Sequence, residues 1–188
     1  MGGEIRIRAA TCADAPGIAR VHVASWRATY RGLMPDAVLD GLSEERRRAL
    51  WEEQLCTEPA DRWRIFVAEA ADGGVVGFAA GGPPLVGQEV AGYDAELPTI
   101  YLLREAQGAG TGRRLMRATA GALLVDGYHR MLLWVLSENR ASRAFYERLG
   151  GVVIAAKPFE IGGATLEETA YGYDLEELVR LLRNDSGG

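Results

Sequence analysis

Three glycines at alternate positions, Gly108, Gly110 and Gly112, form the part of this sequence best suited to hold a ligand. They follow an apolar segment, residues 100–103, and precede a pattern typical of a helix. Glycine lacks the Cβ atom that would keep a ligand off the main chain, and it adopts positive φ where a chain turns sharply. The first N–H groups of a helix have no partner within it, and the helix dipole adds partial positive charge there. The segment therefore predicts a phosphate-binding site.

The spacing of these glycines disfavours the two most familiar nucleotide-binding motifs. The dinucleotide fingerprint requires G-x-G-x-x-G, whereas the order here is G-x-G-x-G. A P-loop requires a lysine directly after its last glycine, and the only lysine of the chain is Lys157. A redox dinucleotide enzyme is therefore a weak interpretation, and a different phosphate-bearing ligand is expected.

The composition indicates one globular domain. The chain has 188 residues, of which 48% are hydrophobic and 25% charged, values that are ordinary for soluble proteins. A formal net charge of −5 argues against a nucleic-acid partner. The apolar run 131–136 is too short to cross a membrane and no secretory signal is recognised, so we expect a cytoplasmic protein without a membrane partner. Cys12 and Cys56 are expected to form neither a disulfide framework nor a metal cluster.

Hydrophobic periodicity predicts the elements that carry the glycine segment. Strands are expected at 5–9, 64–69, 74–80, 95–103, 131–136, 152–156 and 165–175, with a hairpin turn at 72–74. Helices are expected after Asp14, at 43–55, from the glycine segment to about 126, at 139–149 and at 176–182. This order predicts a single α/β domain over residues 1–188, with a mixed sheet and a helix on each side of 131–136.

The segment 22–35 brings aromatic and cationic side chains together at helical spacing. Trp26, Tyr30 and Arg31 precede a break at Gly32. They fit either a helix end packed by two aromatic rings or the wall of a pocket for an acceptor molecule. The loop 81–95, which carries Glu89 and Asp94, is the second candidate for the acceptor side.

The glycine segment resembles the pyrophosphate loop of the GCN5-related N-acetyltransferases. Residues 107–112 read Q-G-A-G-T-G, and the family pattern is Q/R-x-x-G-x-G/A. A second family motif, N-x-x-[AS]-x-x-x-Y-E-[KR]-x-G, is matched at 139–150, after one intervening helix and strand. Residues 96–102 look like the family's fourth strand, which often opens with an acidic residue. The sequence departs from the family pattern at Arg104, where proline is frequent, and at Gly151, where phenylalanine is usual.

The resemblance implies an α+β domain with a mixed sheet of about seven strands, flanked by helices, in which strands 4 and 5 splay apart. It implies transfer of an acetyl group from acetyl-CoA to a primary amine by direct attack in a ternary complex, without a metal, in a homodimer. The donor motif would span 96–127 and the second motif 139–151. The residues that would bind acetyl-CoA are Tyr101, Leu102, Leu103, Gln107, Gly108, Ala109, Gly110, Thr111, Gly112, Asn139 and Ser142.

Two residues in these motifs have the chemistry that acetyl transfer needs. Tyr146 would be the general acid for the leaving thiolate, or else a core tyrosine. Glu96 would be the base that deprotonates the amine, or else a salt-bridged strand residue, with Glu89 and Asp94 as substitutes. Asn139 would also cap the helix that follows it.

The acceptor amine stays open in the sequence. A small amine, an amino-sugar antibiotic, a polyamine and a peptide N-terminus all fit. The tentative acceptor residues are Trp26, Tyr30, Arg31 and Asp94. A non-catalytic acyl-CoA-binding or interaction module on the same fold is the alternative function, and the presence of both Tyr146 and Glu96 counts against it.

Overall fold

A seven-stranded mixed sheet forms the centre of the computed structural model, which describes residues 4–56 and 63–184. The strand order is β1-β2-β3-β4-β5-β7-β6, and of the neighbouring pairs β4 and β5 are parallel. The strands are β1 (Arg6–Ala9), β2 (Arg64–Glu69), β3 (Val75–Gly82), β4 (Ala95–Leu102), β5 (Arg130–Leu136), β6 (Val152–Ile161) and β7 (Ala164–Asp174). The mixed sheet expected from the sequence is confirmed.

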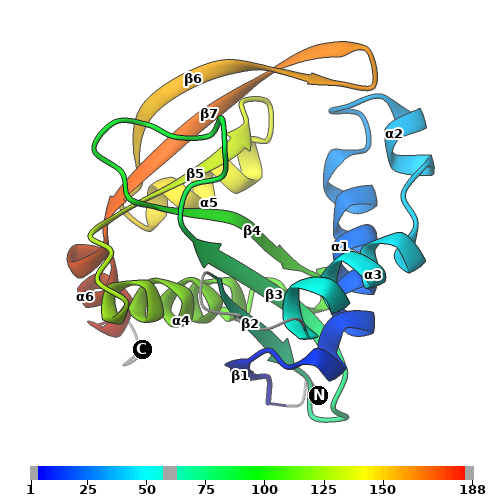
Figure 1. Ribbon diagram of the computed structural model, residues 1–188, viewed down its shortest axis with the longest axis horizontal. Helices are drawn as coiled ribbons and strands as arrows, with labels where there is room; N and C mark the ends of the chain where they lie inside the picture. The colour runs from blue at the N-terminus through cyan, green and yellow to red at the C-terminus, as the bar shows by residue number, and fades with distance from the viewer. Residues whose placement is uncertain (1–3, 57–62, 185–188) are drawn as a thin grey trace.

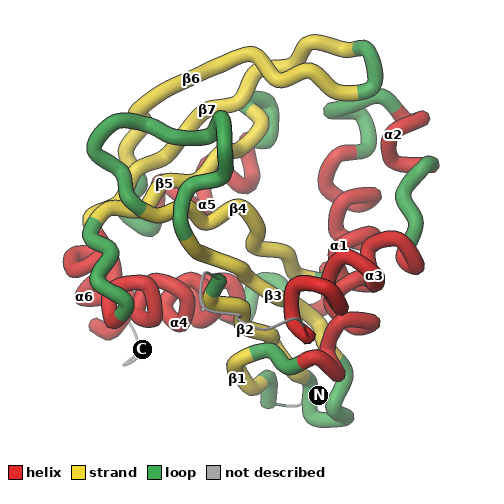
Figure 2. The backbone as a smooth tube through the Cα atoms, in the orientation of Figure 1, coloured by secondary structure: helices red, strands yellow, loops and turns green. Residues whose placement is uncertain are grey.

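Helices cover both faces of this sheet (Figure 1). They are α1 (Ala15–Tyr30), α2 (Asp36–Asp40), α3 (Glu44–Cys56), α4 (Thr111–Val125), α5 (Arg140–Arg148) and α6 (Leu175–Asn184), with 3₁₀ turns η1 (Cys12–Asp14) and η2 (Arg104–Ala106). Helices α4 and α6 pack on one face, and α1 with α3 lies on the other (Figures 1 and 2). The short α2 was not expected, because five residues are too few to show a helical period.

The two larger of three hydrophobic clusters among the described residues lie on opposite faces of the sheet. Leu115 and Leu123 of α4 pack with Met131 between the sheet and α6. On the other face, Ile18 and Val21 of α1 are fully buried against β2 and β3. Their three-residue spacing places both side chains on one face of the helix. The orientation of α1 relative to β4 is therefore set by apolar packing.

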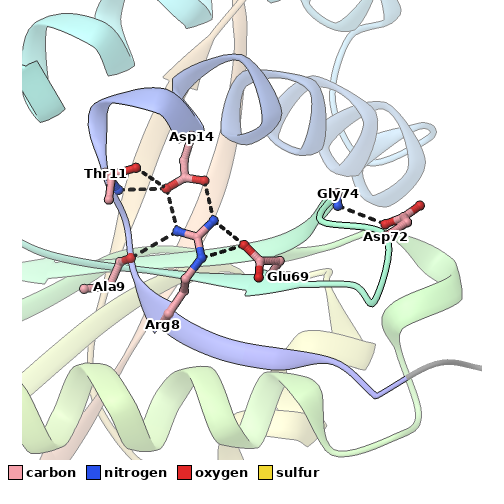
Figure 3. Close-up of polar contacts among 7 residues, drawn as sticks. All are labelled: Arg8, Ala9, Thr11, Asp14, Glu69, Asp72 and Gly74. Carbon is pink, nitrogen blue, oxygen red and sulfur yellow. Dashed lines mark hydrogen bonds and ion pairs between the residues drawn. The ribbon is translucent and has the colours of Figure 1, made fainter.

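A polar network fixes the start of α1 to the sheet (Figure 3). The guanidinium of Arg8 on β1 contacts Asp14, with 2.7 Å between Nη1 and Oδ2, and Glu69 on β2, with 2.6 Å between Nε and Oε2. Thr11 donates its main-chain N–H and its hydroxyl to the same Asp14 carboxylate. Arg8 holds the pKa of Asp14 below its usual range, so this buried carboxylate stays charged and paired.

Cys12 and Cys56 form a disulfide, with 5.0 Å between their Cα atoms. The expectation that they would not pair was wrong. The bond joins η1, at the start of α1, to the last residue of α3. Because α1 and α3 pack against each other, cysteines 44 residues apart in the sequence become neighbours. Such a contact between helices leaves no local signal in the sequence.

Strand β6 is longer than predicted, whereas β7 has the predicted length and begins and ends one residue earlier. Strand β6 continues to Ile161 through Lys157 and Pro158, where the sequence pattern placed its end at Ala156. Because β6 is an edge strand, Pro158 needs no donor for a neighbour on its outer side. The β6–β7 hairpin arches over to α2 (Figure 1), where residues of the hairpin pack with Met34 and Leu39.

Candidate active site

Strands β4 and β5 form a fork. They are paired at Ala95–Met131 and Glu96–Leu132, and beyond these positions the two strands diverge. A bulge contributes to the divergence, because three residues of β3, from Ala80 to Gly82, lie opposite four residues of β4, from Glu96 to Thr99. The splayed strands implied by the resemblance are therefore present, and they open a gap in the middle of the sheet.

The main chain of β4 presents hydrogen-bonding groups to this gap. The N–H of Leu103 donates to the carbonyl of Val76 on β3, at 2.9 Å. Successive residues of a strand direct their main-chain groups to opposite sides, so those of Leu102 face the gap. Its carbonyl there accepts the Ser25 hydroxyl and the Gln107 side-chain amide, each at 3.2 Å. Ser25, which lies on α1, had no signal in the sequence.

The glycine segment leads from the open end of the fork into α4. Gly108 and Gly110 have φ of 80° and 74°, and Gly110 is the N-cap of α4 without a side-chain hydrogen bond. The space where a Cβ would lie on either glycine is open, so the backbone is accessible from outside. Gln107 and Ala109 are exposed on the same loop. The segment thus has the conformation that the phosphate-binding interpretation requires.

Two further features fit an anionic ligand at the start of α4. The Oγ1 atom of Thr111 is buried and has no hydrogen-bond partner in the described chain. A Cβ on Gly112 would lie 3.3 Å from the side chains of Leu102 and Phe145, so glycine lets α4 approach the fork closely. An uncapped helix N-terminus held beside the gap is suited to a pyrophosphate.

Helix α5 brings Tyr146 to the other side of the fork. Asn139 caps α5, since its Oδ1 accepts the N–H of Ser142 at 3.2 Å, which confirms its expected capping role. The ring of Tyr146 is buried and packs edge-on to Phe145, with 5.4 Å between centroids. Burial, with a smaller contribution from Tyr101 on β4, raises the pKa of the Tyr146 phenol well above its usual value. The phenol therefore remains protonated, as a general acid must.

The unusual glycine after the second motif has a steric explanation. The Tyr173 hydroxyl donates a hydrogen bond to the main-chain carbonyl of Tyr146, at 3.0 Å. A Cβ on Gly151 would lie 2.6 Å from that hydroxyl oxygen. Glycine therefore stands where the family usually has phenylalanine, because Tyr173 already fills this space and supports the turn of α5 that carries Tyr146.

Glu96 is a buried carboxylate at the branch point of the fork. The residue is 2% exposed, and its Oε2 accepts the main-chain N–H of Leu85 at 2.7 Å. Burial raises its pKa to about 7. The Leu85 hydrogen bond and the charge of Lys157 oppose this shift, while Glu168 and Glu89 add to it. A carboxylate with a pKa near neutrality is suited to accept a proton from an amine.

Aromatic residues of α1 line the sheet face opposite α4. Trp26 and Tyr30 form an edge-to-face pair with centroids 5.2 Å apart, and they pack against the tip of the β6–β7 hairpin. Burial, with contributions from Tyr101, Tyr146 and Glu168, raises the pKa of Tyr30. These groups are therefore close neighbours in space, and the packing and pocket-wall interpretations of the aromatic pair are compatible.

Arg31 and Asp94 are engaged in contacts that hold the framework. The guanidinium of Arg31 is directed to α2, where it pairs with Asp36 and Asp40 at 3.0 and 3.1 Å. The carboxylate of Asp94 accepts main-chain N–H groups at the start of β5, including that of Arg130 at 2.8 Å. The structure thus gives both residues a structural role.

One residue that faces this region was not predicted from the sequence. Glu168 lies on β7, half-buried, and its Oε2 is buried without a hydrogen-bond partner in the described chain. It sits in an acidic, alternating stretch that resembles any solvent-facing strand. Only the packing of β7 beside the fork distinguishes Glu168 from its exposed neighbour Glu167.

Comparison with known proteins gives these features a common explanation. Residues 25–151 match the model of the acetyltransferase (GNAT) family. The chain is 37% identical to the N-acetyltransferase YuaI of Bacillus subtilis, over 95% of this chain and 98% of that protein. The chain belongs to the GCN5-related N-acetyltransferase family.

Solved structures resemble this N-acetyltransferase over most of its length. The PaiA N-acetyltransferase of Thermoplasma acidophilum, in complex with coenzyme A, has a TM-score of 0.72 at 20% identity, covering 91% of this chain and 99% of that chain. YncA of Salmonella typhimurium, with its cofactor acetyl-CoA, has a TM-score of 0.69 at 25% identity, covering 92% and 95%. The fold expected from the two motifs is confirmed.

Neither a membrane-spanning helix nor a cluster of metal ligands occurs in the part of the chain that the structure describes. Over 4–56 and 63–184, no helix is both long and apolar enough to span a membrane. Within the same ranges, no group of three or more His, Cys, Asp or Glu side chains is arranged to hold a metal ion.

Proposed function

We propose that this acetyltransferase moves the acetyl group of acetyl-CoA to a primary amine by direct attack in a ternary complex. The observation that carries the proposal is the fork itself. One end opens onto the glycine segment, and Glu96, with its pKa near 7, lies at the branch point. The acetyl-CoA bound to YncA supports the identity of the donor.

The donor would be held by main-chain groups. N–H groups between Gln107 and Gly112 would meet the pyrophosphate at the start of α4, with Asn139 and Ser142 near the pantetheine arm. That arm would pair with the free edge of β4 at 101–103, as an added strand does. An N–H near Leu102 would then face the thioester oxygen and stabilise the negative charge that develops there.

Proton transfers would complete the reaction. The amine is an ammonium ion in solution, and it must lose a proton to attack the thioester carbon. Glu96 would accept that proton, directly or through water, as the new C–N bond forms. When the C–S bond breaks, the protonated phenol of Tyr146 would stabilise and protonate the thiolate.

A non-catalytic acyl-CoA-binding module is the alternative. The test is release of free CoA thiol from acetyl-CoA over a panel of polyamines, aminoglycosides, amino acids and short peptides. Amine-dependent release establishes transfer. Stabilisation by acetyl-CoA in a thermal-shift assay, with no release for any amine, favours the binding module.

The assembly and the location of the protein remain predictions. The homodimer would appear as twice the chain mass in light scattering, and a monomer would contradict it. The cytoplasmic location is tested by fractionation of the source cells. A disulfide is more typical of oxidising compartments, so Cys12–Cys56 gives that expectation no support.

A further inference from the structure

The carboxylate of Glu168 has no hydrogen-bond or ion-pair partner in ranges 4–56 and 63–184. Its Oε2 is buried, and no hydrogen bond or ion pair found among the described residues involves this side chain. Burial raises its pKa, an effect that Lys157 opposes. Removing a carboxylate oxygen from water without a hydrogen bond is unfavourable, so a buried, unpaired acceptor needs an explanation. A bound ligand that supplies the missing hydrogen-bond donor is one such explanation.

Glu168 lies on the face of the sheet that carries Trp26 and Tyr30, which is the expected acceptor side of the fork. It lies opposite Leu136 on β5, and directly opposed residues share one face of a sheet. Leu136 packs in the same cluster as Trp26 and Tyr30 of α1. The charge of Glu168 also raises the pKa values of Glu96, Tyr30 and Tyr101, so these groups are its close neighbours.

The nearest cation is committed to another role. Lys157 Nζ donates to the carbonyl of Gly87, at 3.1 Å, and to the side chain of Gln88, so it fastens the loop after β3 to β6. The same ammonium lies 4.2 Å from the centroid of the Trp134 ring. In the described chain it forms no ion pair with Glu96 or Glu168. Two carboxylates therefore face the acceptor side with their charge only partly balanced.

We propose that Glu168 binds a second ammonium group of the acceptor, so that the preferred substrate is a diamine or polyamine rather than a monoamine. The inference rests on the proposed function and names its substrate class. One amine would be deprotonated at Glu96 and acetylated, with the C–N bond formed and the thiol released. The second amine keeps its proton and its charge and is held by Glu168 beside the aromatic wall, which favours a cation. Glu168 is thus a specificity-determining residue.

The experiment compares putrescine with butylamine, two acceptors of equal chain length, in the thiol-release assay with the full chain. The wild type should favour putrescine by about tenfold or more in kcat/KM. Glu168→Gln should remove that preference, mainly through KM for putrescine. Because Glu168 also raises the pKa of Glu96, the two acceptors are compared within each variant at the same pH. Glu167→Gln, the same change on an exposed neighbour, should retain the preference. Spermidine extends the comparison to a larger distance between the amino groups of the acceptor.

The outcomes separate the two proposals. Turnover of monoamines and diamines at equal rates, or equal effects of Glu168→Gln and Glu167→Gln, overturns the role of Glu168 and leaves acetyl transfer intact. No thiol release with any amine overturns the proposed function, and this inference with it. If Glu168→Gln does not fold, thermal shifts of the wild type decide, because putrescine should then stabilise the acetyl-CoA complex more than butylamine does.

Discussion

The main-chain N–H of Leu85 donates a hydrogen bond to the carboxylate of Glu96, with 2.7 Å between N and Oε2. This bond joins the loop that follows β3 to the buried start of β4. It orients the carboxylate at the branch point of the fork and compensates part of the cost of burying it. Burial still dominates, and the pKa of Glu96 rises from 4.5 to about 7.

Acetyl transfer should therefore increase as the pH rises through about 7, since Glu96 must be ionised to accept a proton. Glu96→Gln should lower kcat by about a hundredfold or more and abolish this acid limb. Glu89→Gln is the control. It removes an exposed charge that raises the pKa of Glu96, so the limb should persist with a slightly lower midpoint. A pH–rate profile for Glu96→Gln that keeps the wild-type limb would exclude Glu96 as the base.

The same carboxylate should destabilise the fold above neutral pH. Its pKa is higher in the folded chain than in the unfolded one, so the folded state binds the proton more tightly. Stability is then lost as the pH rises from about 4.5 to about 7. The free energy of unfolding of Glu96→Gln, relative to that of the wild type, should increase by up to about 3 kcal/mol between pH 5 and pH 8. Urea unfolding at both pH values measures this, and an equal difference at both would contradict the burial argument.

Tyr146→Phe should lower kcat by about a hundredfold while acetyl-CoA affinity stays nearly unchanged, because the variant loses the proton donor and keeps the ring packing. Tyr173→Phe is the matched control. It removes the buried hydrogen bond to the Tyr146 carbonyl, so it should cost about 1 kcal/mol of stability and leave most of the turnover. Equal turnover in Tyr146→Phe and the wild type would show that Tyr146 serves packing alone.

Gly110→Ala should weaken acetyl-CoA binding by about tenfold, measured by calorimetry. Gly73→Ala, in the β2–β3 hairpin, provides the comparison, since φ is 74° at Gly110 and 85° at Gly73 and both have open space for a Cβ. Each substitution should cost about 1 kcal/mol of stability through backbone strain. If both variants lose affinity equally, or if Gly110→Ala loses none, the glycine segment is excluded as the pyrophosphate site.

Reduction of Cys12–Cys56 should lower the free energy of unfolding by about 2–4 kcal/mol, because the bond restricts the unfolded chain. Chemical denaturation with and without dithiothreitol measures the loss. Cys12→Ser should match the reduced wild type and show no further response to the reductant, with acetyl transfer retained. Two free thiols titrated in the native, unreduced protein would refute the bond.

The sequence by itself determined the features that depend on neighbouring residues. Glycines at 108 and 110 specify a turn of positive φ before α4, and Asn139 specifies the start of α5, because main-chain conformation and capping are local. Alternating and helical patterns predicted the central strands and α1, since burial of one face follows the period of the element. Two motifs in the right order were then sufficient for the family.

Only the tertiary structure decided which distant residues meet. The disulfide, the exclusion of a side chain at Gly151 by Tyr173, and the unpaired carboxylate of Glu168 all depend on helix packing and strand register. Tertiary contacts also pair Arg31 with α2 and place the Asp94 carboxylate at the start of β5, where it accepts main-chain N–H groups. Contacts of this kind join residues far apart in the chain, so no spacing in the sequence records them.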